Sequence, residues 1–395
     1  MMAALALISQ LRSPASDFFQ FWYAGHLVAI GRSPYDPAAW GIASELYGTR
    51  AGLVAVNCVV PDAPACLWAY PPWTAWLFAP FGFLDPDSGI ALQGAFLLVV
   101  GAVGAVFLAR AVPLSRPAAM IVRFVTVASA PFVWSSFLGH FEGLLLLGAV
   151  VLVHAIRDRR ALPLAASALV LSLKPNLFVA LVPLTIALLV GRRSWRSIAV
   201  ATVTVLIVCV AGLVFEPRWL ASLSLVTTKV TLTAPTTWSM AAHLTPSFAP
   251  VTIALVLAVS AGSAWSSFRA APRVLRDTTF VAAAIALSLA LTPYAHLYDY
   301  LLLAPAIAVA IAALEPRGGV ARAFALVAFG GGFILVTWIA FLSGPHGDEQ
   351  AANALIPPAA LAGMALALRL AARGSAGGRR AAIRPVTSRH DPKSL

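Results

Sequence analysis

The amino-acid sequence predicts an all-α membrane protein whose helices cross the bilayer many times. Hydrophobic residues make up 60% of the chain and charged residues only 11%, with a mean hydropathy of +0.87, whereas soluble domains carry about 25% charged residues. Long apolar runs recur from residue 88 to residue 371, and a helix needs about 20 such residues to cross the hydrocarbon core. Outer-membrane strands would show short alternating segments instead, so we expect a helical bundle.

Three regions are expected along the chain. Residues 1–87 are predicted to form an extracytoplasmic loop with juxtamembrane helices, residues 88–372 a transmembrane bundle, and residues 373–395 a basic, disordered cytoplasmic tail attracted to anionic lipid. Eleven apolar segments of the bundle are predicted to span the membrane: about 88–109, 118–136, 138–156, 161–173, 175–191, 197–215, 247–268, 277–295, 299–314, 323–343 and 351–371.

Arginines occupy alternate loops of this bundle and predict its orientation. By the positive-inside rule the arginine-rich loops face the cytoplasm; they hold Arg110, Arg116, Arg123, Arg157, Arg159, Arg160, Arg192, Arg193, Arg196, Arg269, Arg273, Arg276, Arg317, Arg322 and the tail from Arg369. The opposite loops of the bundle hold only Lys174, Arg218 and Lys229 as clear cations. The net charge of +12 is therefore a topology signal, and with no RNA- or DNA-binding motif beside it we expect membrane lipids and no nucleic acid as partners.

Common catalytic motifs do not occur in the sequence. No CxxC, HExxH, GxxxxGK or GxSxG pattern is present, which argues against the zinc, phosphate-loop and serine-hydrolase classes. The carboxylates and histidines show no ligand spacing, so we expect no metal and no cofactor.

Cys58 and Cys66 lie in an outer loop where a disulfide is permitted, and the spacing leaves it open whether one forms. Cys209 is expected to be a small core residue.

Three short helices are expected in the outer segment. Residues 17–31 mix aromatic and polar side chains like an interfacial helix that lies on the membrane surface. Asp36 is predicted to cap a helix that begins at Pro37 and ends near Tyr47. A third, juxtamembrane helix follows Tyr70-Pro71-Pro72. Translocation of this segment requires either that the short N-terminal tail crosses with the first hairpin or that an upstream helix precedes a start placed too late, and we favour the second.

A set of motifs in this order resembles glycosyltransferase family 87, whose members include polyprenol-phosphate-mannose-dependent mannosyltransferases. The motifs are DFFQFWYAG (17–25), GRSPYDP (31–37), YPPW (70–73) with LFAPFGFL (77–84), LKPN (173–176) and TPYAHLYDYLLL (292–303). The resemblance implies a C-type glycosyltransferase fold, with a first helix ahead of the loop that bears the essential carboxylate. Twelve spans would then be present, with both ends cytoplasmic.

Asp17 is the leading candidate for the general base. The family places its base at the aspartate of this motif, and a carboxylate suits a reaction in which an acceptor hydroxyl loses its proton. The structural alternative is that Asp17 caps the helix, with Gln20 completing a capping box.

Lys174 and His296 are candidates to bind the donor phosphate. An ionisable residue near membrane depth indicates function, and a departing phosphate needs a cation or hydrogen-bond donors. Lys174 is alternatively an interfacial lysine that extends toward the headgroups. Tyr294, Asp299 and His296 are close in sequence and offer groups for phosphate and sugar, although aromatic residues at the end of a span also form an interfacial belt.

His140, Glu142 and Tyr70 complete the candidate set for substrate binding. His140 stands where the family often has glutamine, and Glu142 alternatively serves only to interact with the dipole at a helix N-terminus. The outer loop 216–246 is expected either to cover the donor or to select the acceptor.

The sequence therefore predicts an inverting, metal-independent glycosyltransferase in the cytoplasmic membrane. It would move a hexose, with mannose as the expected sugar, from a polyprenyl-phosphate donor to a hydroxyl of a glycolipid or polysaccharide on the extracytoplasmic side. A flippase or transporter of lipid-linked sugar is the alternative from another class, followed by a non-catalytic assembly factor.

Overall fold

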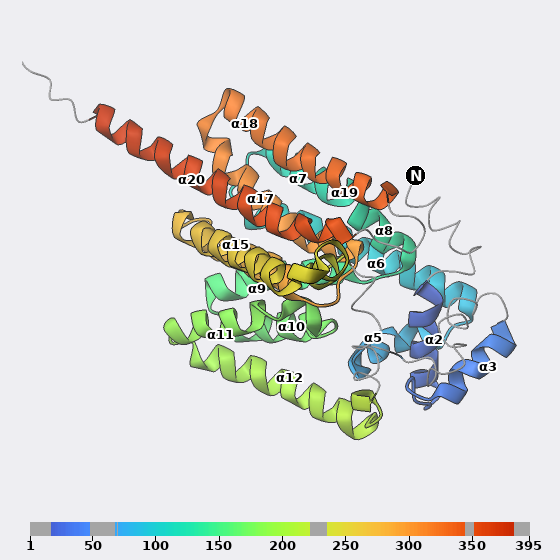
Figure 1. The fold of residues 1–395 in the computed structure, drawn as a ribbon. Helices are drawn as coiled ribbons and strands as arrows, with labels where there is room; N and C mark the ends of the chain where they lie inside the picture. Colours follow the sequence, from blue (N-terminus) through green and yellow to red (C-terminus); the bar gives the residue numbers. More distant parts are fainter. Residues whose placement is uncertain (1–16, 48–67, 69, 222–234, 344–350, 383–395) are drawn as a thin grey trace, which may run out of the picture.

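The computed structural model describes residues 17–47, 68, 70–221, 235–343 and 351–382, and all regular secondary structure in this part of the chain is helical (Figure 1). The elements are α2 (Asp17–Ala29), α3 (Pro37–Tyr47), α5 (Pro72–Gly82), α6 (Pro86–Ala111), α7 (Arg116–Ala128), α8 (Ala130–Leu138), α9 (Glu142–Asp158), α10 (Ala161–Leu171), η2 (Pro175–Phe178), α11 (Leu181–Gly191), α12 (Trp195–Phe215), α14 (Thr237–Leu244), η3 (Pro246–Phe248), α15 (Ala249–Ala270), α16 (Arg276–Leu291), η4 (Leu297–Leu303), α17 (Ala304–Leu314), η5 (Glu315–Arg317), α18 (Gly319–Ala325), η6 (Leu326–Gly331), α19 (Gly332–Ser343), η7 (Ala351–Leu355) and α20 (Ile356–Ala382).

Among the described residues, six helical segments are long and apolar enough to cross a membrane. They are Pro86–Ala111, Trp195–Phe215, Pro246–Ala270, Leu297–Arg317, Gly319–Leu342 and Asn353–Arg373, and α7 with α8 makes a seventh if the pair, bent by 47°, is one span. Each of the eleven segments expected from the sequence contains a helix, but α9, α10, α11 and α16 have only 17, 11, 11 and 16 residues. A polytopic helical membrane protein is confirmed, and the count of eleven stays a prediction.

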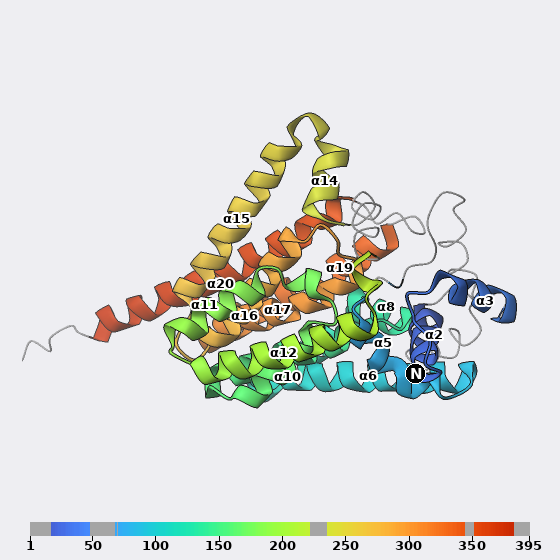
Figure 2. The same ribbon diagram turned by 90° about the horizontal axis from the view of Figure 1, so that it is seen from below.

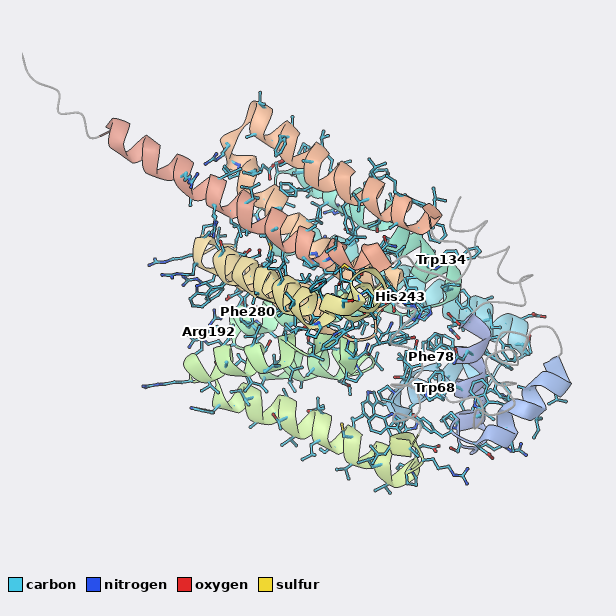
Figure 3. All side chains as sticks on the ribbon, in the orientation of Figure 1. Trp68, Phe78, Trp134, Arg192, His243 and Phe280 are labelled. Atoms are coloured by element: carbon cyan, nitrogen blue, oxygen red, sulfur yellow. The ribbon has the colours of Figure 1, made fainter. Side chains whose placement is uncertain are left out.

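The loops predicted to share the cytoplasmic face are joined to one another at one end of the bundle. Arg157 donates to the carbonyl of Ala111 at 3.0 Å, and Arg192 donates to Asp277 at 2.5 Å and to the carbonyl of Ile156 at 3.2 Å. Figure 3 shows Arg192 at this end and Trp68 with Phe78 at the other. The two groups of loops therefore lie at opposite ends of the bundle.

The outer segment packs into the protein core. Phe21, Trp22 and Leu27 of α2 are at most 1% exposed, and α2 crosses α5 at two glycines. A Cβ at Gly25 would lie 2.4 Å from the carbonyl oxygen of Phe78, and one at Gly82 would lie 2.3 Å from the amide nitrogen of His26. These glycines let α5 cover the apolar face of α2, and the position of residues 17–31 at the membrane surface stays a prediction.

The centre of the bundle is the η4–α17 segment. Every residue of α17 is buried, and the apolar window of the Leu297–Arg317 span is 100% buried. Figure 2 shows α16 and α20 beside α17, and α15 diverging from α20 toward α14. The C-terminus of η4–α17 thus reaches the arginine-rich end, while its N-terminus carries the motif that begins at Thr292.

The structure also bears on Asp36, on the C-terminal tail and on the cysteines. Asp36 accepts from the amide of Ala38 at 3.1 Å ahead of α3, as predicted for a cap. Helix α20 continues to Ala382, so the tail is not irregular from residue 373, although three glycines lie in residues 373–382. Cys209 is half-buried against the core, and Cys58 and Cys66 lie outside the described residues.

Candidate active site

Polar residues from four distant segments meet at the end of the bundle that carries α2 and α5. They are Asp17 at the start of α2, His140 and Glu142 at the turn between α8 and α9, Lys174 between α10 and η2, and Tyr294, His296 and Asp299 ahead of α17. Hydrogen bonds and close charge contacts link these seven candidates to one another in a single network. Tyr70, the eighth candidate, adjoins the network and contacts the rings of Phe21 and Phe141.

The turn that carries His140 is shaped by the bend between α7 and α8 and by Gly139. Ser129 is extended (φ −66°, ψ 146°) and Pro131 follows near the start of α8, so the helix bends by 47°, as proline favours. Gly139 has φ +83°, a conformation that glycine adopts without strain. A Cβ at Gly139 would lie 2.4 Å from the ring of Phe18, so its absence lets α2 approach this turn.

Asp17 and His140 form a pair at one side of the network. Nε2 of His140 lies 2.7 Å from Oδ2 of Asp17, and the two side chains are 3% and 33% exposed. A carboxylate only accepts hydrogen bonds, so an ionised Asp17 requires the proton of His140 on Nε2. Nδ1 then faces Oε1 of Glu142 at 3.8 Å, beyond hydrogen-bond reach.

Lys174 lies between two buried carboxylates. Its Nζ donates to Oε1 of Glu142 at 3.2 Å and to Oδ1 of Asp299 at 2.5 Å, and the three side chains are 3%, 0% and 0% exposed. Ser135 donates to Oε2 of Glu142 at 2.8 Å. Helix α5 holds the adjacent backbone, because Thr74 donates to the carbonyl of Leu173 at 3.3 Å. The ammonium is paired on two sides, as burial of a charge requires.

Asp299 joins Lys174 to His296. Its Oδ2 accepts from the backbone amide of His296 at 2.7 Å, while Oδ1 binds Lys174. Nε2 of His296 lies 2.6 Å from the hydroxyl of Tyr294, and Asn176 donates to the carbonyl of Tyr294 at 2.7 Å. His296 and Tyr294 are only half-buried, so this side of the network is accessible, as is Asp17.

Aromatic rings fix the histidines from the side. The ring of Tyr298 is stacked between His140 at 4.0 Å and His296 at 4.9 Å, and Nζ of Lys174 lies 4.8 Å from its centroid. Tyr70 contacts Phe21 at 5.1 Å. Tyr298 thus has a packing role, and the sequence alone did not single out Ser135 or Asn176. The only signal was their proximity to candidate residues.

The arrangement offers two accessible sets of groups joined by a buried ionic core. Asp17 presents a carboxylate at one side, and His296 with Tyr294 presents hydrogen-bond donors at the other. A carboxylate and hydrogen-bond donors held apart by a rigid framework can remove a proton from one substrate and bind an anion of another. The described residues contain no group of three or more His, Cys, Asp or Glu side chains able to hold a metal ion.

Part of the loop 216–246 packs beside this end. Thr237 and Trp238 donate to the carbonyls of Ala290 and Leu291 at 2.9 Å each, and Trp219 contacts Trp73 at 5.3 Å. His243, labelled in Figure 3, lies in the last turn of α14. Lys229 lies outside the described residues, and whether this loop covers a donor or selects an acceptor stays a prediction.

Comparison with known families identifies the class of protein. The model of glycosyltransferase family 87 matches residues 68–293 of the chain. The matched range includes Tyr70, His140, Glu142 and Lys174, and excludes Asp17 and the segment from Tyr294 to Asp299. Searches of curated proteins and of solved structures each gave no significant match.

Proposed function

Because this chain belongs to glycosyltransferase family 87, we propose that it transfers a hexose, with mannose as the expected sugar, from a polyprenyl-phosphate donor to an acceptor hydroxyl. The acceptor is a glycolipid or polysaccharide on the extracytoplasmic side of the cytoplasmic membrane. Family membership and the helical architecture support glycosyl transfer by a membrane protein. The donor, the sugar, the acceptor and the side of the membrane are proposed.

The pairing of Asp17 with His140 is the single observation that best supports this function. The 2.7 Å contact uses Oδ2 of Asp17, and the side chain is 33% exposed whereas its partner is 3% exposed. One carboxylate oxygen is thus oriented by the protein while the other can accept a substrate proton. A general base needs such a fixed geometry within hydrogen-bond reach of its substrate.

The proposed reaction is a single displacement. Asp17 takes the proton of the acceptor hydroxyl as the hydroxyl oxygen attacks the anomeric carbon. The bond from that carbon to the phosphate oxygen breaks, and its electron pair leaves with the polyprenyl phosphate. Attack and departure on opposite faces invert the anomeric configuration. The step requires no metal, in keeping with the family resemblance.

His296 and Tyr294 are proposed to bind the departing phosphate directly. Both are half-buried at the accessible side of the network, and hydrogen-bond donors placed at developing negative charge stabilise the transition state. Lys174 is less accessible, because its side chain is 3% exposed and its ammonium is bound to two carboxylates. We therefore place Lys174 behind these groups, where it holds Asp299 and, through Asp299, the backbone of His296.

Reconstitution in liposomes tests the proposal. The protein is supplied with polyprenyl-phosphate mannose and a membrane glycolipid fraction, and new glycosidic bonds are detected by mass spectrometry. A mannosylated product with inverted configuration is expected. Movement of intact polyprenyl-phosphate mannose across the bilayer without product would replace the proposal by the flippase alternative.

A further inference from the structure

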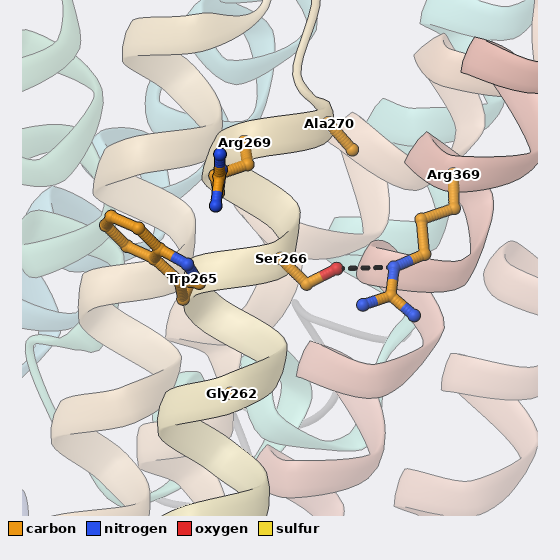
Figure 4. Close-up of a pocket in the computed structure, with 6 residues that line it drawn as sticks. All are labelled: Gly262, Trp265, Ser266, Arg269, Ala270 and Arg369. Atoms are coloured by element: carbon orange, nitrogen blue, oxygen red, sulfur yellow. Dashed lines mark hydrogen bonds between the residues drawn. The ribbon is translucent and has the colours of Figure 1, made fainter.

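Helices α15 and α20 form a furrow that the proposed reaction does not use. A hollow of about 390 Å³ lies between them, lined by Gly262, Trp265, Ser266, Arg269, Ala270 and Arg369 (Figure 4). A second hollow of about 410 Å³ shares Gly262, Ser266 and Arg369 with the first. The furrow lies toward the arginine-rich end of the bundle, whereas the candidate active site lies at the end of α2 and α5.

The first hollow carries two positive charges. Ser266 accepts from Nε of Arg369 at 2.6 Å, which fixes the plane of that guanidinium and uses one of its five N–H donors. Figure 4 shows the two terminal nitrogens of Arg369 beyond this bond. The guanidinium of Arg269 lies 5.5 Å from the ring of Trp265. No acidic side chain is among the described residues that line either hollow.

The second hollow has the character of lipid-facing surface. Val259, Ala362, Ala365 and Leu366 contribute its apolar wall, and only 6% of the apolar window of the Pro246–Ala270 span is buried. Trp265 is 62% exposed beside the arginines, as expected of an aromatic residue at the membrane interface. A cationic hollow thus continues directly into an apolar one along the same two helices.

We propose that this furrow binds one anionic phospholipid, with its phosphate between Arg269 and Arg369 and an acyl chain along Val259 and Leu366. Guanidinium groups bind phosphate oxygens through paired hydrogen bonds. The charge of the first hollow and the apolar wall of the second match the two parts of such a lipid. A free phosphate would use only the first.

Lipid retention tests this site independently of glycosyl transfer. The full chain is placed in nanodiscs of phosphatidylglycerol and phosphatidylcholine with identical acyl chains. Native mass spectrometry of the protein released from the nanodiscs then identifies the lipids that stay bound. The ratio of retained phosphatidylglycerol to phosphatidylcholine is expected to exceed the bulk ratio about tenfold, the factor given by one strong ionic hydrogen bond. Retention in the bulk ratio would overturn the proposal.

Two variants localise the effect. Arg269→Ala/Arg369→Ala removes both charges, and Gly262→Trp keeps them while filling the hollow, since a Cβ at Gly262 meets no atom within 4 Å. Both are expected to lose the enrichment. Arg273→Ala/Arg317→Ala removes two exposed arginines outside the hollows and should keep it. Enrichment that survives both furrow variants, or is lost equally in the control, would contradict the site.

Thermal unfolding provides the check on folding and on the kind of ligand. The variants should unfold at the wild-type temperature in pure phosphatidylcholine, and phosphatidylglycerol should raise that temperature only for the wild type and the control. Inorganic phosphate alone should give no such rise. An equal rise with inorganic phosphate would show an anion site without a lipid and would overturn the proposal.

Discussion

Nζ of Lys174 lies 2.5 Å from Oδ1 of Asp299, although the two residues are 125 positions apart in the chain. The same ammonium binds Glu142 at 3.2 Å, so one lysine joins the turn before α9 to the segment before α17. Because all three groups are buried, removal of the lysine would leave both carboxylates without a compensating charge.

Loss of Lys174 is expected to destabilise the protein strongly. Lys174→Met leaves two buried carboxylates unpaired, which costs about 3–5 kcal/mol. Thermal unfolding in detergent measures the change. The triple variant Lys174→Met/Glu142→Gln/Asp299→Asn removes the surplus charge and should recover part of the loss. A single variant as stable as wild type would contradict the ionic core.

His140 is expected to orient Asp17 through a hydrogen bond. His140→Ala removes the donor and should lower kcat about 10- to 100-fold, the rate equivalent of a hydrogen bond to a charged group. His140→Gln can donate to the same oxygen and should retain most of the rate, in line with the glutamine often found there in the family. Equal loss in both variants would exclude this role.

His296 is expected to act on the donor side. His296→Ala should weaken binding of polyprenyl-phosphate mannose about tenfold, since a hydrogen bond to an anion is lost, and leave acceptor KM unchanged. Tyr294→Phe should have a smaller effect in the same direction. Equilibrium binding of labelled donor measures both. A rise in the KM for the acceptor instead would show that these side chains bind the acceptor and not the donor.

Glu216 gives the outer segment a defined pH dependence. Burial raises the pKa of Glu216, against the opposing effects of its hydrogen bond from Ser33 and of Arg218. The folded protein therefore holds this proton to higher pH than the unfolded chain, so stability falls as pH rises from the ordinary pKa of about 4.3 through the raised value.

Glu216→Gln is expected to remove that contribution. The difference in unfolding temperature between wild type and Glu216→Gln, measured from about pH 4 to pH 7, should favour the wild type progressively less as pH rises. A difference that does not change with pH would show that Glu216 titrates alike in both states.

Much of the helical architecture can be predicted from the sequence, whereas the polar network of the candidate active site can be predicted only in part. Apolar runs predict helices, and the alternation of arginines predicts which loops share an end, because both signals are local. The pairing of Lys174 with Glu142 and Asp299 is not local. It depends on how α9, α10 and η4 pack, although buried charges in an apolar chain do imply partners.

Two features of the structure depend on pairs of segments, whereas periodicity describes one helix at a time. The composition of α2 indicates an amphipathic helix, but not that Gly25 and Gly82 let α5 cover it. The ring of Tyr298 is packed between His140 and His296, and only the fold brings His140 to it.

Asp17→Asn is the decisive variant, because Asp17 is proposed to be the general base of glycosyl transfer. The substitution keeps the shape of the side chain and its contact with His140 but removes the proton acceptor. Product formation from polyprenyl-phosphate mannose is measured beside donor binding and unfolding temperature. We expect kcat to fall at least about 100-fold while donor binding and unfolding temperature are retained. Transfer by Asp17→Asn at the wild-type rate would exclude a general base at this position and leave Asp17 as a structural partner of His140.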